Sequence, residues 1–378
     1  MEPIKIHLFI AGYGTVSKAL VEIIRTRKEF LQRALGKELL ICGLCNSKKF
    51  LMDANGIKLG TQEYMIEQLS NGKEISVLPN SVQDKISISL TNYITEACNL
   101  NLINSIFVDC TASKDIALTY TKLFKNKFSV VTCNKIANSL SYDSYRELFS
   151  TAVSEGVNYH YETTVCAALP VLATIKQIIN SGDQITKIEG ILSGTLNYLF
   201  SCYNGEMNFA SLVKEAKLLG YTEPDPRVDL RGKDVLRKFI ISAREAGEVI
   251  EETEIEFNNF LPDSLLQQTG ATFAEDEQQF YTGLENEERH LKSLYENAAV
   301  QGRKLRFAAT LDKSRNEETP LYRVGLIEVD STHPFFSLEG SDNSMLITTD
   351  FYPKGIIIKG AGAGAYQTAS GLLNDILK

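Results

Sequence analysis

The feature that most constrains the fold is the order strand, glycine-rich turn, helix at the start of the chain. Isoleucine or leucine occupies every second position from Ile4 to Ile10, which predicts a strand over residues 4–11. The turn Gly12-Tyr13-Gly14 follows, and a helical run is predicted from Thr15 to Ala34. Glycines let the backbone approach a pyrophosphate, and a helix N-terminus offers N–H groups and a positive dipole end. Gly12 and Gly14 are therefore predicted to bind a dinucleotide.

Two positions near this loop qualify the prediction. Ser17 stands where the full Gly-x-Gly-x-x-Gly pattern has its third glycine, so a tight structural turn remains the alternative. The second predicted strand ends in Asn46-Ser47-Lys48-Lys49, without the carboxylate that usually grips the ribose of NAD. Lysines there favour the 2′-phosphate of NADP. The alternative is that the two lysines only face solvent, and NAD is not excluded as the cofactor.

Further apolar strands alternate with helical stretches along the first part of the chain. Strands are predicted over residues 39–45, 106–110 and 128–133, with a helical stretch over 113–124. This alternation predicts an α/β fold, a Rossmann-type doubly wound parallel sheet with right-handed crossovers. We assign residues 1–140 to this NAD(P)-binding domain.

Polar side chains follow two of these strands, where ligands of open α/β sheets bind. Thr111 and Ser113 come after one strand, and Lys135 comes after the next. The two hydroxyls could donate to a cofactor or cap the next helix, and capping is the more common role. Lys135 could reach the nicotinamide or a substrate oxygen, and a surface lysine is an equal alternative.

The remaining sequence predicts a second, α+β domain over residues 141–345, followed by a C-terminal segment over residues 346–378. Helices are predicted over residues 169–179, 195–203, 209–219 and 232–246, a strand over 185–192, and surface helices and loops over 251–288. Residues 304–358 resemble a meander of short strands. A second glycine-rich loop, Gly360–Gly364, precedes a final helix that runs to Leu377.

The segment Gly220–Lys238 is the most charge-dense part of the chain. Pro224 and Pro226 hold its loop extended, and acids and bases crowd around them. Such a loop suits a small zwitterion, whose ammonium needs acids and whose carboxylate needs donors. Asp234 and Lys238 share one face of the following helix, and an exposed ion pair of little energetic weight is the alternative reading.

Composition narrows the classes of partner and location. The net charge of −8 argues against nucleic acid or a membrane surface as partner, because both favour basic patches. No apolar run reaches the length of a membrane span, and the N-terminus leads straight into a strand without a signal peptide. Seven cysteines, an odd number, fit a reducing cytoplasm better than a disulfide framework. The Cys42-x-x-Cys45 spacing is isolated, so a metal or redox role is not expected.

The chain resembles the homoserine dehydrogenases over nearly its whole length. The similarity rests on Gly220-Tyr-Thr-Glu-Pro-Asp-Pro with the Asp-Leu, Gly, Asp-Val and Arg-Lys that follow. It extends in order through Val108–Ser113, Val130–Lys135, Gly190–Leu196 and Gly360–Gly364. The dehydrogenase half of the bifunctional aspartokinase–homoserine dehydrogenases is the most similar form, so a fused aspartokinase domain outside this chain is one implied partner.

The resemblance implies a reaction and roles for individual residues. The family interconverts L-aspartate 4-semialdehyde and L-homoserine with NAD(P)H, in threonine and methionine biosynthesis. Lys238 matches the proton donor, with Asp234 and Lys135 beside it as catalytic residues. The implied substrate-binding residues are Glu223, Asp229, Thr195, Tyr221 and Asp234. The implied cofactor-contacting residues are Gly12, Gly14, Thr15, Val16, Thr111, Lys135, Gly220 and Gly364, to which the sequence reading adds Asn46, Ser47, Lys48 and Ser113.

The family also implies that residues 141–345 carry catalysis and form a homodimer, and that residues 346–378 return to the first domain. It further implies a monovalent cation site, with sodium as the ion. The matching run is Glu162–Pro170, and the implied ligands are Glu162, Val165, Ala167 and Leu169. Cys166 and Ala168 stand where the family usually has glycine. If those glycines need positive φ, Cys and Ala strain the loop and put the ion site in doubt.

Two other function classes remain open. A non-catalytic NADP-binding regulator would bind cofactor without homoserine-dependent reduction of NADP. Another semialdehyde oxidoreductase, such as aspartate-semialdehyde dehydrogenase, would act through a thioester and need a nucleophilic Cys with a nearby His. The chain has seven Cys but only four His, and no Cys lies in a convincing loop.

Overall fold

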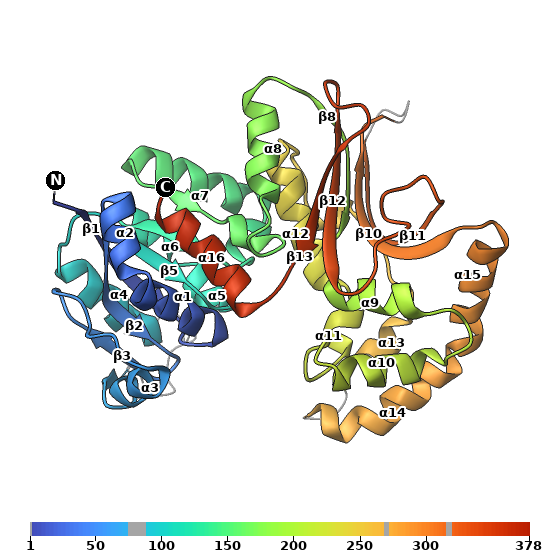
Figure 1. Ribbon diagram of the computed structural model, residues 1–378, viewed down its shortest axis with the longest axis horizontal. Coiled ribbons are helices and arrows are strands. Elements are labelled where there is room, and N and C mark those ends of the chain that lie inside the picture. The colour runs from blue at the N-terminus through green and yellow to red at the C-terminus, as the bar shows by residue number, and fades with distance from the viewer. Residues whose placement is uncertain (1, 75–87, 268–271, 315–319) are drawn as a thin grey trace. The chain divides into compact units, whose positions relative to one another are not determined.

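The computed structural model describes residues 2–74, 88–267, 272–314 and 320–378, which form two compact units (Figure 1). The first unit holds Met1–Ala168 together with Ala363–Lys378, and the second holds Leu169–Gly362. Within the described ranges, no helix is both long and apolar enough to cross a bilayer.

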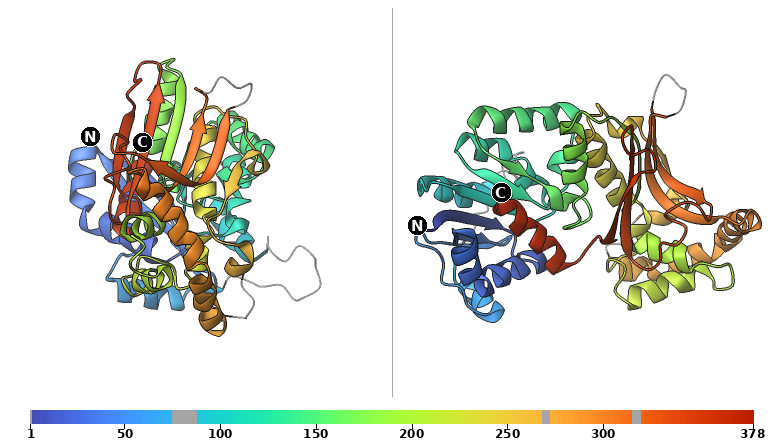
Figure 2. Two further views of the ribbon diagram at one scale, coloured as in Figure 1. Left: turned by 90° about the vertical axis from the view of Figure 1, so that its right-hand side faces the viewer. Right: turned by 45° about the horizontal axis from the view of Figure 1, so that its top comes forward.

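The first unit is a sheet with helices on both faces (Figure 2). Its strands are β1 (Ile4–Ala11), β2 (Lys37–Cys45), β3 (Lys49–Met52), β4 (Lys73–Glu74), β5 (Ser105–Asp109), β6 (Ser129–Thr132) and β7 (Tyr159–His160). Its helices are α1 (Thr15–Thr26), α2 (Lys28–Leu35), α3 (Gln62–Ser70), α4 (Ile88–Asn99), α5 (Lys114–Ala117), α6 (Tyr120–Lys125), α7 (Tyr142–Glu155) and α16 (Ala365–Ile376), with 3₁₀ turns at Ala137–Ser139 and Glu162–Thr164.

The described strands of this sheet follow the order β4-β3-β2-β1-β5-β6-β7. The neighbouring strands β2, β1, β5, β6 and β7 pair parallel, which confirms the predicted Rossmann-type sheet. Strands β3 and β4 add an antiparallel edge beside β2. The side chains of β1 explain its central place. Leu8 and Ile10 pack with α1 and α16 on one face, whereas Phe9 meets Phe128 on the other.

The predicted helix over residues 15–34 is two helices. Its break falls at Arg27, between α1 and α2. The Thr26 hydroxyl donates to the carbonyl of Glu22 at 2.8 Å, a local bond that competes with regular helix geometry.

The second unit contains the other sheet. Its strands are β8 (Ile185–Ile191), β9 (Glu256–Asn258), β10 (Lys304–Asp312), β11 (Leu321–Val329), β12 (Asp342–Thr349) and β13 (Ile356–Ala361). Its helices are α8 (Val171–Asn180), α9 (Gly194–Cys202), α10 (Phe209–Leu218), α11 (Arg227–Leu230), α12 (Lys233–Glu245), α13 (Asp263–Leu266), α14 (Phe273–Asn286) and α15 (Glu288–Val300), with a 3₁₀ turn at Glu252–Glu254.

The order of this sheet is β13-β12-β8-β10-β11-β9 in the described part of the chain. All neighbours pair antiparallel except β11 and β9. The predicted meander over residues 304–358 is therefore wrong in one respect, because β8 lies between β10 and β12. Helix α12 contacts β10, β11 and α8.

Both domain boundaries lie at other residues than those predicted from the sequence. The first unit extends to residue 168 instead of 140, because α7 packs on α6 and β7 pairs with β6. The C-terminal return begins at residue 363 instead of 346, because β12 and β13 belong to the second sheet and only α16 joins the first unit.

Candidate active site

The glycine-rich loop has the geometry that phosphates need. Gly12 has φ of 87°, and a Cβ on it would lie 2.6 Å from Cγ2 of Thr111. A Cβ on Gly14 would meet nothing within 4 Å. Among the described residues no side chain caps the N-terminus of α1, which begins at Thr15. The loop therefore fits a dinucleotide. A side chain at Gly14 would meet no protein atom, whereas a side chain at Gly12 would clash with Thr111.

Ser17 does not disturb this loop. Its side chain is fully buried, and its hydroxyl donates to the carbonyl of Gly14 at 3.1 Å. A small hydroxyl thus takes the place of the third glycine within the first turn of α1.

A buried carboxylate, which the sequence reading passed over, organises the ends of β5 and β6. Asp109 accepts from the backbone N–H of Thr111 at 2.8 Å, from the Tyr120 hydroxyl at 2.6 Å and from the Asn134 amide at 3.0 Å. Burial raises the pKa of Asp109. The Asn134 amide also donates to the carbonyl of Ser113 at 2.9 Å. One acid therefore fixes both loops that carry the predicted cofactor contacts.

The hydroxyls of these loops take part in local bonds. Ser113 accepts from the N–H of Ile116 and caps α5, as the capping alternative predicted. Thr111 accepts from the N–H of Ser113 at 3.1 Å. Lys135 is half-buried directly after Asn134. The signal for Asp109 was an acid at the end of an apolar strand, with an amide after the neighbouring strand.

The end of β2 forms a tight connection to β3. The side-chain oxygen of Asn46 accepts from the N–H groups of Lys48 and Lys49, both at 2.8 Å. Ser47 and Lys48 are exposed. Asn46 therefore shapes the turn, and Lys48 is an exposed residue of that turn.

A carboxylate in the second unit draws the predicted substrate residues together. Asp229 accepts from the Thr195 hydroxyl at 3.0 Å and from the backbone N–H of Glu223 at 2.8 Å. Thr195 also contacts the carbonyl of Tyr221 at 2.5 Å. Burial is the main reason that the pKa of Asp229 is raised to about 6. Tyr221 packs against Tyr198 with ring centroids 4.7 Å apart and the rings tilted by 39°, and Tyr221 is 40% exposed.

Lys238 lies one turn along α12 from Asp234 and is buried, 8% exposed. Its Nζ is 2.8 Å from an Asp234 oxygen and donates to the carbonyl of Leu192 at 2.7 Å. The Asp234 side chain is half-exposed. The exposed ion pair considered as an alternative is therefore wrong for Lys238. Because Leu192 lies between β8 and α9, the ammonium is held in the same unit as Thr195.

Two other predicted cofactor-contacting residues, Gly220 and Gly364, have backbone conformations that favour glycine. Gly220 has φ of 75° and ends α10, and its N–H donates to the carbonyl of Lys217 at 3.1 Å. Gly364 has φ of 129° and precedes α16. The predicted cofactor contacts in the first unit are Gly12, Gly14, Thr15, Val16, Asn46, Ser47, Lys48, Thr111, Ser113, Lys135 and Gly364, and Gly220 is in the second.

The run predicted to hold a cation is strained. Cys166 and Ala167 have φ of 58° and 55°, a left-handed conformation that costs about 1–2 kcal/mol for a residue with Cβ. The expectation of positive φ is thus correct for Cys166, whereas the second such residue is Ala167 and not Ala168. The backbone N–H of Glu162 donates to Asp375 of α16 at 3.2 Å, and the carbonyl of Leu169 accepts from Val171 at 2.7 Å.

Known families match both units. The family model for homoserine dehydrogenase matches residues 170–377, and the model for the NAD-binding domain of homoserine dehydrogenase matches residues 12–162. The homoserine dehydrogenase of Saccharomyces cerevisiae is 41% identical over 278 residues, which cover 72% of this chain and 74% of the yeast protein.

Two further proteins extend the comparison. The bifunctional aspartokinase/homoserine dehydrogenase of Buchnera aphidicola is 33% identical over 374 residues, 99% of this chain and 42% of that protein. The chain thus spans less than half the length of that bifunctional relative. A hyperthermophilic archaeal homoserine dehydrogenase solved with NADPH has the same fold, with a TM-score of 0.70, 23% identity and coverage of 99% and 97% of the two chains. The chain belongs to the homoserine dehydrogenase family.

Proposed function

We propose that this chain catalyses the reversible NAD(P)H-dependent reduction of L-aspartate 4-semialdehyde to L-homoserine, a step of threonine and methionine biosynthesis. The observation that carries the proposal is the buried ammonium group of Lys238, held between Asp234 and the carbonyl of Leu192. The nicotinamide, when bound, supplies or accepts the hydride. Lys238 protonates the developing alkoxide oxygen in the direction of homoserine and removes that proton in the reverse direction.

Further residues of the second unit bind and orient the substrate. We assign the substrate ammonium to the carboxylates of Glu223 and Asp234, because a zwitterion needs acids at that end. Asp229 and Thr195 fix the backbone of the loop that presents Tyr221 and Glu223. Lys135 of the first unit is assigned to the cofactor and to catalysis as a further cation. The first unit is proposed to bind the cofactor, and the second to carry catalysis and dimerisation.

Protonation of Asp229 gives the first prediction. With a pKa of about 6, Asp229 is ionised above that pH and accepts both of its hydrogen bonds. Below it, the carboxyl is neutral, and its oxygens are weaker acceptors than those of the carboxylate, so the hold on Glu223 weakens. The KM for homoserine is expected to rise roughly tenfold per pH unit below about 6. Asp229→Asn should show a raised KM without that acid limb, and a wild-type KM that is flat from pH 5 to 8 would contradict the assignment.

NADP is the proposed preferred cofactor, because the turn after β2 offers Lys48 and no carboxylate in residues 46–49. Lys48→Glu is expected to lower the ratio of kcat/KM for NADPH to that for NADH by about tenfold, since it replaces attraction to a 2′-phosphate with repulsion. Lys28→Glu, an equal charge change at an exposed position of α2, is the matched control. An unchanged ratio in Lys48→Glu would refute the role of Lys48.

A sodium ion is proposed at the strained run, with the carboxylate of Glu162 and the carbonyls of Val165, Ala167 and Leu169 as ligands. Support comes from the left-handed backbone at Cys166 and Ala167, because strain held in a loop is typical of ligand sites. Replacing sodium by an organic cation at constant ionic strength should lower activity.

The assembly and location are also proposals. A homodimer through the second unit is supported by the exposed Ile357 on edge strand β13 and the exposed Phe351 and Tyr352 nearby. Light scattering after size exclusion measures it. All seven cysteines are free thiols, which supports a cytoplasmic location. A fused aspartokinase domain remains a proposed partner, as in the bifunctional relative.

Three of the seven thiols do not support the thioester alternative. Burial raises the pKa of Cys42 to about 11 and that of Cys45 to about 12, and it also raises the pKa of Cys98. A nucleophilic cysteine needs the opposite shift.

One assay tests the proposed function. The purified chain is mixed with L-homoserine and NADP, then NAD, and the absorbance of reduced nicotinamide is followed. We expect homoserine-dependent reduction, faster with NADP. Cofactor binding without any homoserine-dependent reduction would instead identify a non-catalytic regulator.

A further inference from the structure

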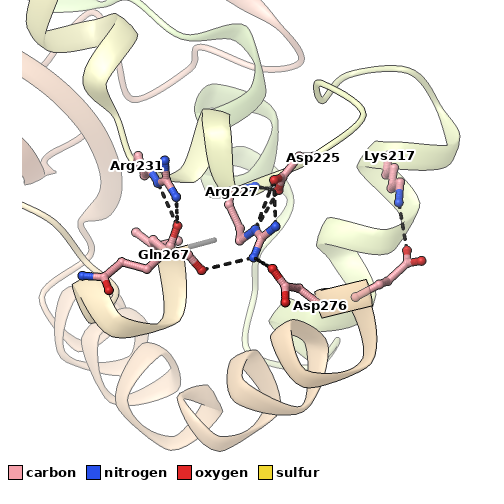
Figure 3. A network of polar contacts seen from close by, with 8 residues as sticks. Lys217, Asp225, Arg227, Arg231, Gln267 and Asp276 are labelled. Carbon is pink, nitrogen blue, oxygen red and sulfur yellow. Dashed lines mark hydrogen bonds and ion pairs between the residues drawn. The ribbon is translucent and has the colours of Figure 1, made fainter. Parts of the chain in front are cut away.

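A buried arginine fixes the loop that carries the substrate residues. Arg227 begins α11 and is 1% exposed. Its guanidinium binds Asp225 through Nε at 2.9 Å and Nη2 at 2.9 Å (Figure 3). Through Nη1 it binds Asp276 of α14 at 2.8 Å and the carbonyl of Gln267 at 3.1 Å. The two-pronged contact with Asp225 defines both distance and orientation, which a single ion pair does not.

Helix α11 joins this ion cluster to the proposed substrate pocket. Arg227 and Asp229 lie two residues apart on α11, so their side chains leave the helix in different directions. Arg227 reaches α14 and the residue after α13, whereas Asp229 reaches Thr195 and the backbone N–H of Glu223. A shift of α11 therefore moves the group that holds Glu223.

A second ion pair on α14 offers a comparison with the contacts of Arg227. Lys217 of α10 pairs with Glu277 of α14 at 2.8 Å, next to Asp276 in sequence (Figure 3). This pair ties α14 to α10, and Lys217 and Arg227 both lie over the ring of Phe273, 4.4 and 5.0 Å from its centroid. Arg231 gives α11 a second anchor through the carbonyl of Leu266.

We propose that Arg227, held by Asp225 and Asp276, is a positioning residue for the amino-acid substrate. It fixes α11 so that Asp229 keeps Glu223 and Thr195 in the binding arrangement. The inference rests on the proposed function, because Glu223 and Asp229 are assigned to substrate there. Since these residues hold substrate in the ground state and the transition state alike, their displacement changes KM and leaves kcat nearly unchanged.

Asp276→Asn in the full chain is the first test, because it removes one charge of the cluster and keeps a hydrogen-bond acceptor. We expect the KM for homoserine to rise about tenfold, with kcat within about twofold and an unchanged Kd for NADPH. Asp276→Glu restores the carboxylate and should return KM toward the wild-type value. Glu277→Gln, which breaks only the tie between α14 and α10, should leave KM unchanged.

Arg227→Lys is the second test, because a lysine keeps the charge and loses the two-pronged contact. Its KM should rise as in Asp276→Asn, with the same kcat. Equal KM values in wild type, Asp276→Asn and Arg227→Lys would overturn the inference, and so would an equal rise in Glu277→Gln. If the wild type itself shows no homoserine-dependent reduction of NADP, the proposed function fails instead, which separates the two failures.

Discussion

Replacing Lys238 by methionine is expected to lower kcat/KM for homoserine by about a thousandfold, within the range for loss of a general acid–base group. Methionine keeps much of the buried volume of the side chain, so the loss measures the ammonium group and not a cavity. Both kcat and kcat/KM should fall together, because the proton moves only in the transition state. Steady-state kinetics with NADP measure the effect.

The control for this variant lies on the same helix. Lys233→Met removes an exposed lysine from the first turn of α12 and should retain wild-type kinetics. The Kd for NADPH and the thermal unfolding midpoint should change little in Lys238→Met, since Asp234 is half-exposed and can be solvated. A folded Lys238→Met with full turnover would remove Lys238 from the mechanism.

The second large effect is expected at the glycine-rich loop, where two glycines should respond differently. In Gly12→Ala the new Cβ would meet Thr111 at 2.6 Å and the carbonyl oxygen of Cys110 at 3.2 Å, at a φ of 87°. We expect both a loss of stability of about 1–3 kcal/mol and a Kd for NADPH raised at least about a hundredfold. Fluorescence titration and thermal unfolding measure the two quantities.

Gly14→Ala separates the two effects. Its Cβ meets no protein atom within 4 Å, and its φ of −95° suits any residue, so the fold should be unaffected. Its methyl group would occupy the space assigned to the pyrophosphate, so the Kd for NADPH should still rise by about tenfold or more. If Gly14→Ala binds NADPH with wild-type affinity, the loop is a structural turn and not the cofactor site.

Elements with local signals were predicted well from the sequence. Strand β1 has its expected bounds, and β8 ends one residue early, because apolar residues and following glycines mark such strands. Long-range pairing leaves no such signal. The insertion of β8 between β10 and β12, and the assignment of β7 to the first sheet, depend on contacts between distant segments.

The candidate site divides in the same way. The sequence identifies Asp234 and Lys238 as neighbours on one helix face, but the burial of Lys238 depends on packing that spacing does not reveal. It shows that Gly220–Lys238 is rich in charged residues, but not which partner each of them contacts. The structure assigns Asp225 and Arg227 to an ion cluster, and Asp229 to the backbone of Glu223. Asp109 carried a signal, an acid at the end of an apolar strand, but its contact with Asn134 depends on the pairing of β5 with β6.

The transfer of hydrogen from homoserine to the cofactor tests the central claim most directly. L-Homoserine with two deuterium atoms at C4 is incubated with NADP and the purified chain, and the products are analysed by mass spectrometry. The account predicts one deuterium on the reduced nicotinamide ring and one on the aldehyde carbon of aspartate 4-semialdehyde. Reduced cofactor without deuterium, or no homoserine-dependent reduction by the folded protein, would contradict it.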